Sequence, residues 1–269
     1  MKFFCQKSVA KYVCVAFSAA LLLTGCKGKD GDPGPAGANG TPGTAGSQGP
    51  SGQNLTGTMA GFVNPVDEYG NPTSKSGVVV TIEGVTPAVT VTSNVDGRYE
   101  FTNLRNGTYN LSYARAGLSA ARRLGIGHVG GDQPTFLGTF TISGASTTTF
   151  GTFSATSSAG LVQMTIPYAN LGTPTGSFTR FAIFASASPG VTAANGTYIT
   201  TFSASSSPYN VAFSRATFNN VGFATGTPVY LVVYGAPSLL TSYADPLTGR
   251  PVFIGLSVVP SNQAVTTVP

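Results

Sequence analysis

The sequence has no tryptophan, one histidine and three cysteines, and only 9% of its residues are charged. A metal site needs several His, Cys or carboxylate ligands that converge, and nucleophilic catalysis needs a nucleophile beside an oriented base. The histidine, His128, has one nearby acid, Asp132, in the segment GIGHVGGD, and no Gly-x-Ser-x-Gly elbow occurs. We therefore expect no enzyme, with no catalytic residue, metal site or cofactor.

The few acidic residues also offer little for glycoside hydrolysis, which needs two carboxyl groups about 5 to 9.5 Å apart. Asp67 and Glu68 are adjacent and would diverge on an extended chain. Glu83 and Glu100 could face each other, but a solvated strand face explains them better. A formal Gly-x-Gly-x-x-Gly match at residues 125–130 is followed by Gly-Asp-Gln-Pro, which does not favour the helix of a dinucleotide site.

Basic residues are too few to bind nucleic acid. Lys2, Lys7 and Lys11 account for three of the 14 Lys and Arg, so 11 remain against 9 acidic residues, a net charge of +2. The only adjacent basic pair is Arg122-Arg123. Without a basic patch, binding to the phosphate backbone is not expected.

The longest apolar run, 14 residues from Tyr12 to Gly25, follows those lysines. It is too short to cross a bilayer, which takes about 20 residues, and matches the core of a secretory signal. The run ends in Leu23-Thr24-Gly25-Cys26, and this segment resembles the bacterial lipobox. The resemblance implies a signal peptide over 1–25, cleavage between Gly25 and Cys26, and a lipid such as palmitate on Cys26.

The lipoprotein resemblance also bears on location and redox state. A membrane is the expected partner through the lipid on Cys26, and Lys27 after it favours the outer membrane of the cell envelope, with surface exposure as one outcome. Cys5 and Cys14 would be lost with the signal peptide, so the folded region would have no thiol and no disulfide.

From Gly28 to Asn54, glycine occupies every third position through nine triplets. A collagen triple helix requires this period because only glycine fits at its axis, and residues 26–54 resemble a short bacterial collagen-like region. A flexible Gly-rich linker shares the composition. Either form is a spacer with a reach of roughly 80 Å at about 3.1 Å per residue, and trimerisation through the repeat is possible but not favoured.

After Asn54 the apolar period becomes two, which indicates strands. Apolar residues alternate with polar ones in several runs: Val78, Val80, Ile82; Tyr99, Phe101; Tyr109, Leu111, Tyr113. Asn94-Val95-Asp96-Gly97 between two such runs predicts a tight turn, and if its Asp-Gly pair forms a type I′ turn, Gly97 has positive φ. No helical period is evident after residue 26.

The stretch from Gly57 to about Ser143 resembles the carboxypeptidase regulatory-like domain. Two segments carry the resemblance, GTMAGFVNPVDEYGNPTSKSGVVVTIEG and, after a short gap, VTVTSNVDGRYEFTNLRNGTYNLSYARAGL. The resemblance implies a seven-stranded, transthyretin-like β-sandwich over 55–146, grouped with carbohydrate-binding-like folds and without chemistry of its own. The glycine-rich stretch 120–143 departs from the pattern, which puts the last two strands in doubt.

Residues 147–269 contain four charged residues, Asp245, Arg180, Arg215 and Arg250. The alternation continues in five runs: Val162, Met164, Ile166; Phe181, Ile183; Tyr209, Val211, Phe213; Val229, Leu231, Val233; Val252, Ile254, Leu256. This pattern predicts a second sandwich, and ATFNNVGFATGTPVYLVVYGA is similar to the fibronectin type III pattern. The expected architecture is all-β, with two sandwich modules in series after the signal peptide and the stalk.

The function that these features favour is non-enzymatic: a lipid-anchored envelope protein that presents β-modules for adhesion or for binding a partner such as a matrix protein. The alternative is a carbohydrate-binding lipoprotein of a nutrient-capture system. Tyr69, Tyr230 and Tyr234 are the candidates for an exposed sugar platform. An exposed aromatic pair on a sandwich face would favour glycans, and an exposed apolar patch would favour protein partners.

Overall fold

The computed structural model describes residues 55–170, 174 and 177–269, all of which lie in one compact unit. The predicted signal peptide, the lipid site at Cys26 with its cleavage after Gly25, and the Gly28–Asn54 repeat lie outside the described residues. These predictions therefore remain predictions.

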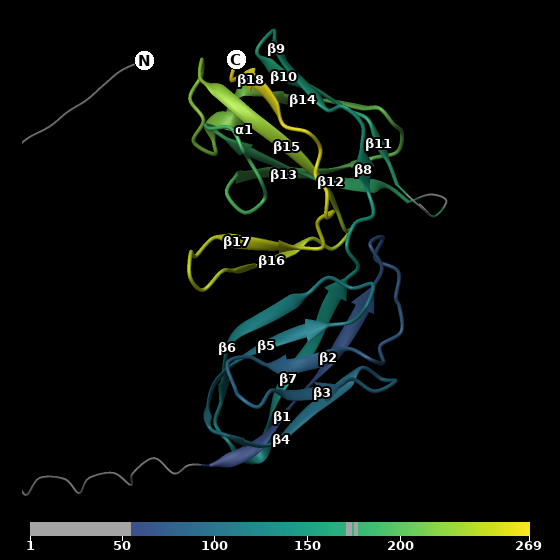
Figure 1. The fold of residues 1–269 in the computed structure, drawn as a ribbon, viewed down its shortest axis with the longest axis vertical. Coiled ribbons are helices and arrows are strands. Elements are labelled where there is room, and N and C mark those ends of the chain that lie inside the picture. The colour runs from purple at the N-terminus through teal and green to yellow at the C-terminus, as the bar shows by residue number, and fades with distance from the viewer. Residues whose placement is uncertain (1–54, 171–173, 175–176) are drawn as a thin grey trace, which may run out of the picture. The chain divides into compact units, whose positions relative to one another are not determined.

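The protein is all-β, as the alternation predicts (Figure 1). The strands are β1 (Thr56–Val66), β2 (Val79–Ile82), β3 (Val89–Thr92), β4 (Arg98–Arg105), β5 (Gly107–Ala114), β6 (Ala121–His128), β7 (Gly131–Ser143), β8 (Thr149–Phe150), β9 (Ser154–Ser158), β10 (Leu161–Ile166), β11 (Tyr168–Ala169), β12 (Thr179–Ser186), β13 (Thr197–Ala204), β14 (Tyr209–Ser214), β15 (Pro228–Ala236), β16 (Thr241–Ala244), β17 (Pro251–Ile254) and β18 (Ala264–Thr267). A short helix, α1 (Arg215–Asn219), corrects the expectation of no helix, because five residues are too few to display a helical period.

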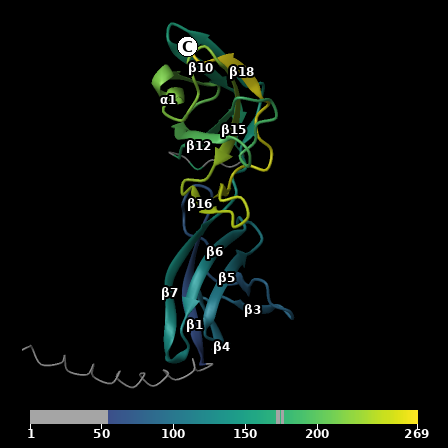
Figure 2. The same cartoon turned by 90° about the vertical axis from the view of Figure 1, so that its left-hand side faces the viewer.

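The first sandwich packs a sheet of order β4-β1-β7 against a sheet of order β3-β2-β5-β6 (Figure 2). β1 pairs antiparallel with β4 and parallel with β7. The alternating residues predicted to point inward do so: Val78, Val80, Ile82, Tyr99, Phe101, Leu111 and Tyr113 are each at most 2% exposed. They form one core together with Met59 and Val63 of β1.

Two tyrosine hydroxyls meet inside this core. Tyr99 and Tyr113 come from opposite sheets and share a hydrogen bond of 2.9 Å between their hydroxyl oxygens. Burial raises the pKa of both hydroxyls, and for Tyr113 the neighbouring Tyr99 raises the pKa further. The neutral forms are therefore favoured in the folded protein, and the pair satisfies polar groups that would otherwise be costly to bury.

The turn between β3 and β4 is not of type I′. That type requires positive φ at both central residues, whereas Gly97 has φ of 85° and Asp96 is not among the residues with positive φ. The backbone N–H of Gly97 donates to the carbonyl of Asn94 at 2.9 Å, and the side chain of Asn94 accepts from the N–H groups of Asp96 and Arg98. The loop ends in a left-handed glycine, as the Asp-Gly pair indicates.

The second sandwich encloses its core between the sheet β13-β12-β15-β18 and the strands of β14-β10-β9 and β11-β8. Val162, Met164 and Ile166 of β10 face Phe181, Ile183, Val229, Leu231 and Val233, as their spacing predicts. β12 and β15 are buried on both faces, however, because Phe181–Ala185 and Leu231–Val233 are all buried.

The outer face of this sheet is covered by the β16-β17 hairpin and the loop around Val191. Phe184, Val232 and Tyr234 pack there against Leu240 and Phe253. The neighbouring hairpin residue Ile254 belongs to the core of the first sandwich. Within the described residues, no helix is long and apolar enough to span a membrane.

Candidate binding sites

An aromatic pair lies on the outer face of the β4-β1-β7 sheet. In β1, Met59 and Val63 point into the core, so Phe62 between them points outward. The pairing register places Phe62 opposite Arg98 of β4, and Ala60 opposite both Glu100 of β4 and Phe136 of β7. Because residues directly opposite share a sheet face, Phe62, Phe136, Arg98 and Glu100 form one surface, here called the aromatic face.

The aromatic face is exposed, and contacts between its own side chains hold them in place. The rings of Phe62 and Phe136 meet edge to face, with centroids 6.0 Å apart and planes at 74°. Phe136 is 62% exposed. Arg98 and Glu100 form an ion pair, with side chains 48% and 29% exposed. The result is an apolar centre with a donor and an acceptor group beside it.

The second candidate is a cleft around Arg180 on β12, here called the Arg180 cleft. Arg180 lies between the buried residues Thr179 and Phe181, and points to the face opposite the Phe181 ring. Its Nη1 donates a hydrogen bond to the carbonyl of Ser238, in the segment that leads into β16. Its Nε is buried and has no hydrogen-bond partner among the described residues.

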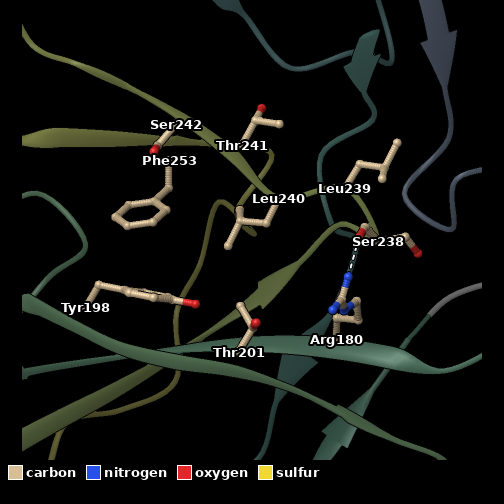
Figure 3. A pocket seen from close by; sticks show the side chains of 9 residues that line it. All are labelled: Arg180, Tyr198, Thr201, Ser238, Leu239, Leu240, Thr241, Ser242 and Phe253. Atoms are coloured by element: carbon tan, nitrogen blue, oxygen red, sulfur yellow. Dashed lines mark hydrogen bonds between the residues drawn. The ribbon is translucent and has the colours of Figure 1, made fainter.

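Arg180 and Ser238 line two cavities, of about 290 Å³ and about 280 Å³. Figure 3 shows the first: Tyr198 and Thr201 of β13 form one wall, and Phe253 and Ser242 of the hairpin form the other. Among the residues drawn, only Arg180 and Ser238 share a hydrogen bond. The hydroxyl groups that line the hollow therefore form no hydrogen bonds with one another.

Apolar side chains form the rim of these cavities. Leu239 lines the first cavity and is 46% exposed, and Phe178 lines the second and is 57% exposed. The Tyr198 ring packs against Phe253 with centroids 5.0 Å apart and planes at 31°. The cleft therefore combines a cation, hydroxyl groups and ring surfaces.

No acid compensates Arg180 within the described residues, where the ion pairs are Arg98–Glu100 and Arg122–Glu83. Asp245, the sole acid after residue 146, caps its own turn by accepting bonds from Leu247 and Thr248. The bonds from the backbone and side chain of Thr248 hold the pKa of Asp245 below its usual value. The guanidinium of Arg180 thus keeps an uncompensated positive charge.

His128 and Asp132 are not brought together. His128 is 3% exposed; its Nε2 lies 3.2 Å from the carbonyl of Leu104 and its Nδ1 lies 2.7 Å from the hydroxyl of Thr135. Because a carbonyl only accepts, Nε2 carries a proton and donates it. Asp132 is exposed. His128 joins β6 to its neighbours in the fold.

The predicted carboxylate candidates also separate. Glu83 accepts a bidentate contact from Arg122, which raises the pKa of that guanidinium, and Glu100 pairs with Arg98. Glu83 follows β2, and Glu100 lies on β4 in the opposite sheet. The two carboxylates therefore do not form the facing pair that glycoside hydrolysis would need. Arg122, one of the adjacent basic pair, is thus engaged by Glu83.

Asp67 and Glu68 take part in loop structure. Partial burial of Asp67 acts to raise its pKa, but hydrogen bonds from the Asn71 side chain and from backbone N–H groups outweigh it, so the pKa is lowered. The two carboxylate oxygens of Glu68 accept bonds from the backbone N–H and hydroxyl of Thr147, at 2.9 and 2.6 Å. Asp67 thus stabilises its own turn, and Glu68 holds that loop against Thr147.

The prediction of an exposed sugar platform is wrong for two of the three candidate tyrosines. Tyr234 is 9% exposed and its hydroxyl accepts from the N–H of Ala193, and Tyr230 is half-buried against the same cluster. The hairpin and the Val191 loop cover the face on which both were expected to be exposed. Tyr69 is half-buried and lines the cavity beside Arg180.

Sequence reasoning missed Phe62, Phe136 and Arg180. Phe62 is out of phase with the inward residues of its strand, which was a usable signal, and Arg180 is a lone charge in a nearly uncharged segment. Within the described residues, no group of three or more His, Cys, Asp and Glu is placed to hold a metal.

No protein-family model matches the chain, and no curated protein matches it. Among solved structures, similarity is found to a cohesin–X-dockerin complex from Acetivibrio cellulolyticus, at 20% identity over 34% of this chain and 59% of that chain, with a TM-score of 0.28. A DUF3823 family protein from Bacteroides ovatus matches at 9% identity over 80% of this chain and 100% of that one, with a TM-score of 0.29.

The FN1–FN3 domains of chicken CNTN1 match at 10% identity over 79% of this chain and 65% of that one, with a TM-score of 0.26. The chain spans 59% and 56% of the first two solved chains, less than two thirds of either. At these identities and TM-scores, the neighbours carry no argument about function.

Proposed function

We propose that this chain is a non-enzymatic, lipid-anchored protein of the bacterial cell envelope that binds a protein partner through its first sandwich. The anchor is proposed from the Leu-Thr-Gly-Cys segment that ends at Cys26, and the outer membrane from Lys27. The Gly28–Asn54 repeat would hold the sandwiches away from the lipid surface.

The observation that carries the binding role is the aromatic face. Aromatic residues and arginine are enriched at the centres of protein interfaces, where a few anchors supply most of the binding energy. Phe136 is 62% exposed, whereas several other phenylalanines of the chain are buried in its cores. Phe62 and the Arg98–Glu100 ion pair lie beside it on the same face. An exposed apolar centre with a polar margin is typical of a docking surface.

The test is a binding screen of the purified chain against matrix proteins and glycans, repeated with Phe136→Ala. We expect a protein ligand whose affinity falls at least tenfold, about 1.4 kcal/mol, with little change in stability. Val259→Ala is the control, because Val259 is a similarly exposed apolar residue of the second sandwich, 68% against 62%, and lines neither candidate site. Equal affinities for the wild type and Phe136→Ala would remove the aromatic face from the proposal.

Carbohydrate binding is the second candidate function. It is favoured by the hydroxyl groups and packed rings of the Arg180 cleft, and it would occupy a different sandwich.

A further inference from the structure

We infer that the Arg180 cleft is a binding site for a carboxylated saccharide, in which Arg180 receives the carboxylate of a uronic acid residue. The inference is independent of the aromatic face, because the two sites share no residue.

The first step is the unmet bonding capacity of Arg180. A guanidinium has five N–H donors in a rigid fork, and the described contacts use one, from Nη1 to the Ser238 carbonyl. Nε is buried without a partner. Nη2 also has no hydrogen-bond partner among the described residues and, unlike Nε, is not enclosed by protein atoms, so a ligand oxygen can reach it.

The second step is charge. Arg180 has no carboxylate partner within the described residues, so its positive charge is not neutralised at either of the two cavities that it lines. Carboxylates bind arginine through two parallel N–H···O bonds, which are stronger than bonds between neutral groups. The ligand group that this cation would recognise is therefore a carboxylate.

The third step is the rest of the wall. Beside Arg180 on the same sheet, the cleft presents the hydroxyls of Tyr198 and Thr201, and the hairpin residues Ser242 and Phe253 lie across the hollow, with the Phe253 ring against Tyr198 (Figure 3). A pyranose has a hydroxyl rim and an apolar C–H face, and needs both kinds of partner. The cavity in Figure 3 has a volume of about 290 Å³, and a second cavity of about 280 Å³ shares Arg180 and Ser238 with its lining.

The experiment is titration calorimetry of the full chain in detergent with oligogalacturonate, with its fully methyl-esterified form, and with polyglutamate. We expect oligogalacturonate to bind, with affinity that falls as salt rises because the contact is ionic. The methyl ester has the same rings and hydroxyls but no charge, and should bind at least tenfold more weakly. If polyglutamate binds and oligogalacturonate does not, the cleft recognises peptide carboxylates and the saccharide assignment is overturned.

Variants locate the site. Arg180→Gln should lower the affinity for oligogalacturonate at least tenfold, whereas Arg215→Gln removes the same charge from an exposed residue of α1 and should leave it unchanged. Thr201→Val, which removes one hydroxyl without touching Arg180, should weaken binding about threefold and keeps the test valid if Arg180→Gln is poorly folded.

Absence of oligogalacturonate binding to the folded wild type, or binding that neither Arg180→Gln nor Thr201→Val weakens, overturns the inference. Neither outcome bears on the proposed function, which the Phe136→Ala measurement decides.

Discussion

Gly97 offers a quantitative test of how the β3–β4 turn is built. Its φ is 85°, a left-handed conformation, and a Cβ at this position would lie 2.4 Å from the carbonyl oxygen of Val63 and 3.2 Å from the Cβ of Lys75. The same stretch of β1 is tied to the turn, because the N–H of Val63 donates to the carbonyl of Gly97 at 2.9 Å. Gly97→Ala therefore meets a conformational obstacle and a backbone obstacle together.

The two contributions have separate magnitudes. A left-handed conformation costs a residue with a Cβ about 1–2 kcal/mol. The contact with Val63 cannot be relieved by rotating a side chain, so the turn must shift, and loss of the Val63–Gly97 hydrogen bond adds about 0.5–1.5 kcal/mol. We expect Gly97→Ala to destabilise the fold by roughly 2–4 kcal/mol, with the remainder from the displaced strand.

Gly84→Ala separates the contributions. Gly84 has a similar φ of 78°, but a Cβ there would meet nothing within 4 Å. It should cost only the conformational part, about 1–2 kcal/mol. Urea titrations followed by circular dichroism measure both variants, since the denaturation midpoint reports stability at unchanged slope. Equal losses for the two alanine variants would refute the reasoning that the Val63 carbonyl excludes a side chain at Gly97.

Three further outcomes are expected. Cys26→Ser should abolish labelling of the chain by a palmitate analogue in growing cells, and persistent label would place the lipid elsewhere. The contribution of the Tyr99–Tyr113 pair to stability should be constant below about pH 10 and fall above it. Burial raises the pKa values of both hydroxyls, so above that pH the folded chain keeps protons that the unfolded chain releases. Urea midpoints measured as a function of pH test this, and Tyr113→Phe should reduce the fall. Residues 27–269 should sediment as a monomer, and a trimer that Gly40→Ala dissociates would contradict the spacer role of the repeat.

Most strands of the two cores were predictable because one face of each is buried and the other is not, whereas β12 and β15 are buried on both faces. A period of two places every second side chain inward, and Val80, Tyr99 and Met164 followed that rule with exposures of at most 2%. The turn at Gly97 was predictable in place and in its glycine. Its type was not, because the side chain of Asn94 caps the loop.

The candidate sites depended on contacts between distant segments. Tyr234 alternates with core residues and by spacing alone should be exposed, but the β16-β17 hairpin, about ten residues further on, folds back over its strand and buries it. Arg180 became a candidate only because that hairpin forms the opposite wall of its cleft.

The sequence by itself determined the all-β class and the inward-facing residues, since local alternation and turn residues dictate both. It also contains the Leu-Thr-Gly-Cys segment that resembles a lipobox and the Gly-x-y period, which are linear signals. Only the tertiary structure decided which outward-facing side chains stay exposed, because that depends on which loop covers which sheet. Phe136 stayed uncovered and Tyr234 did not, and no spacing rule along one strand distinguishes them.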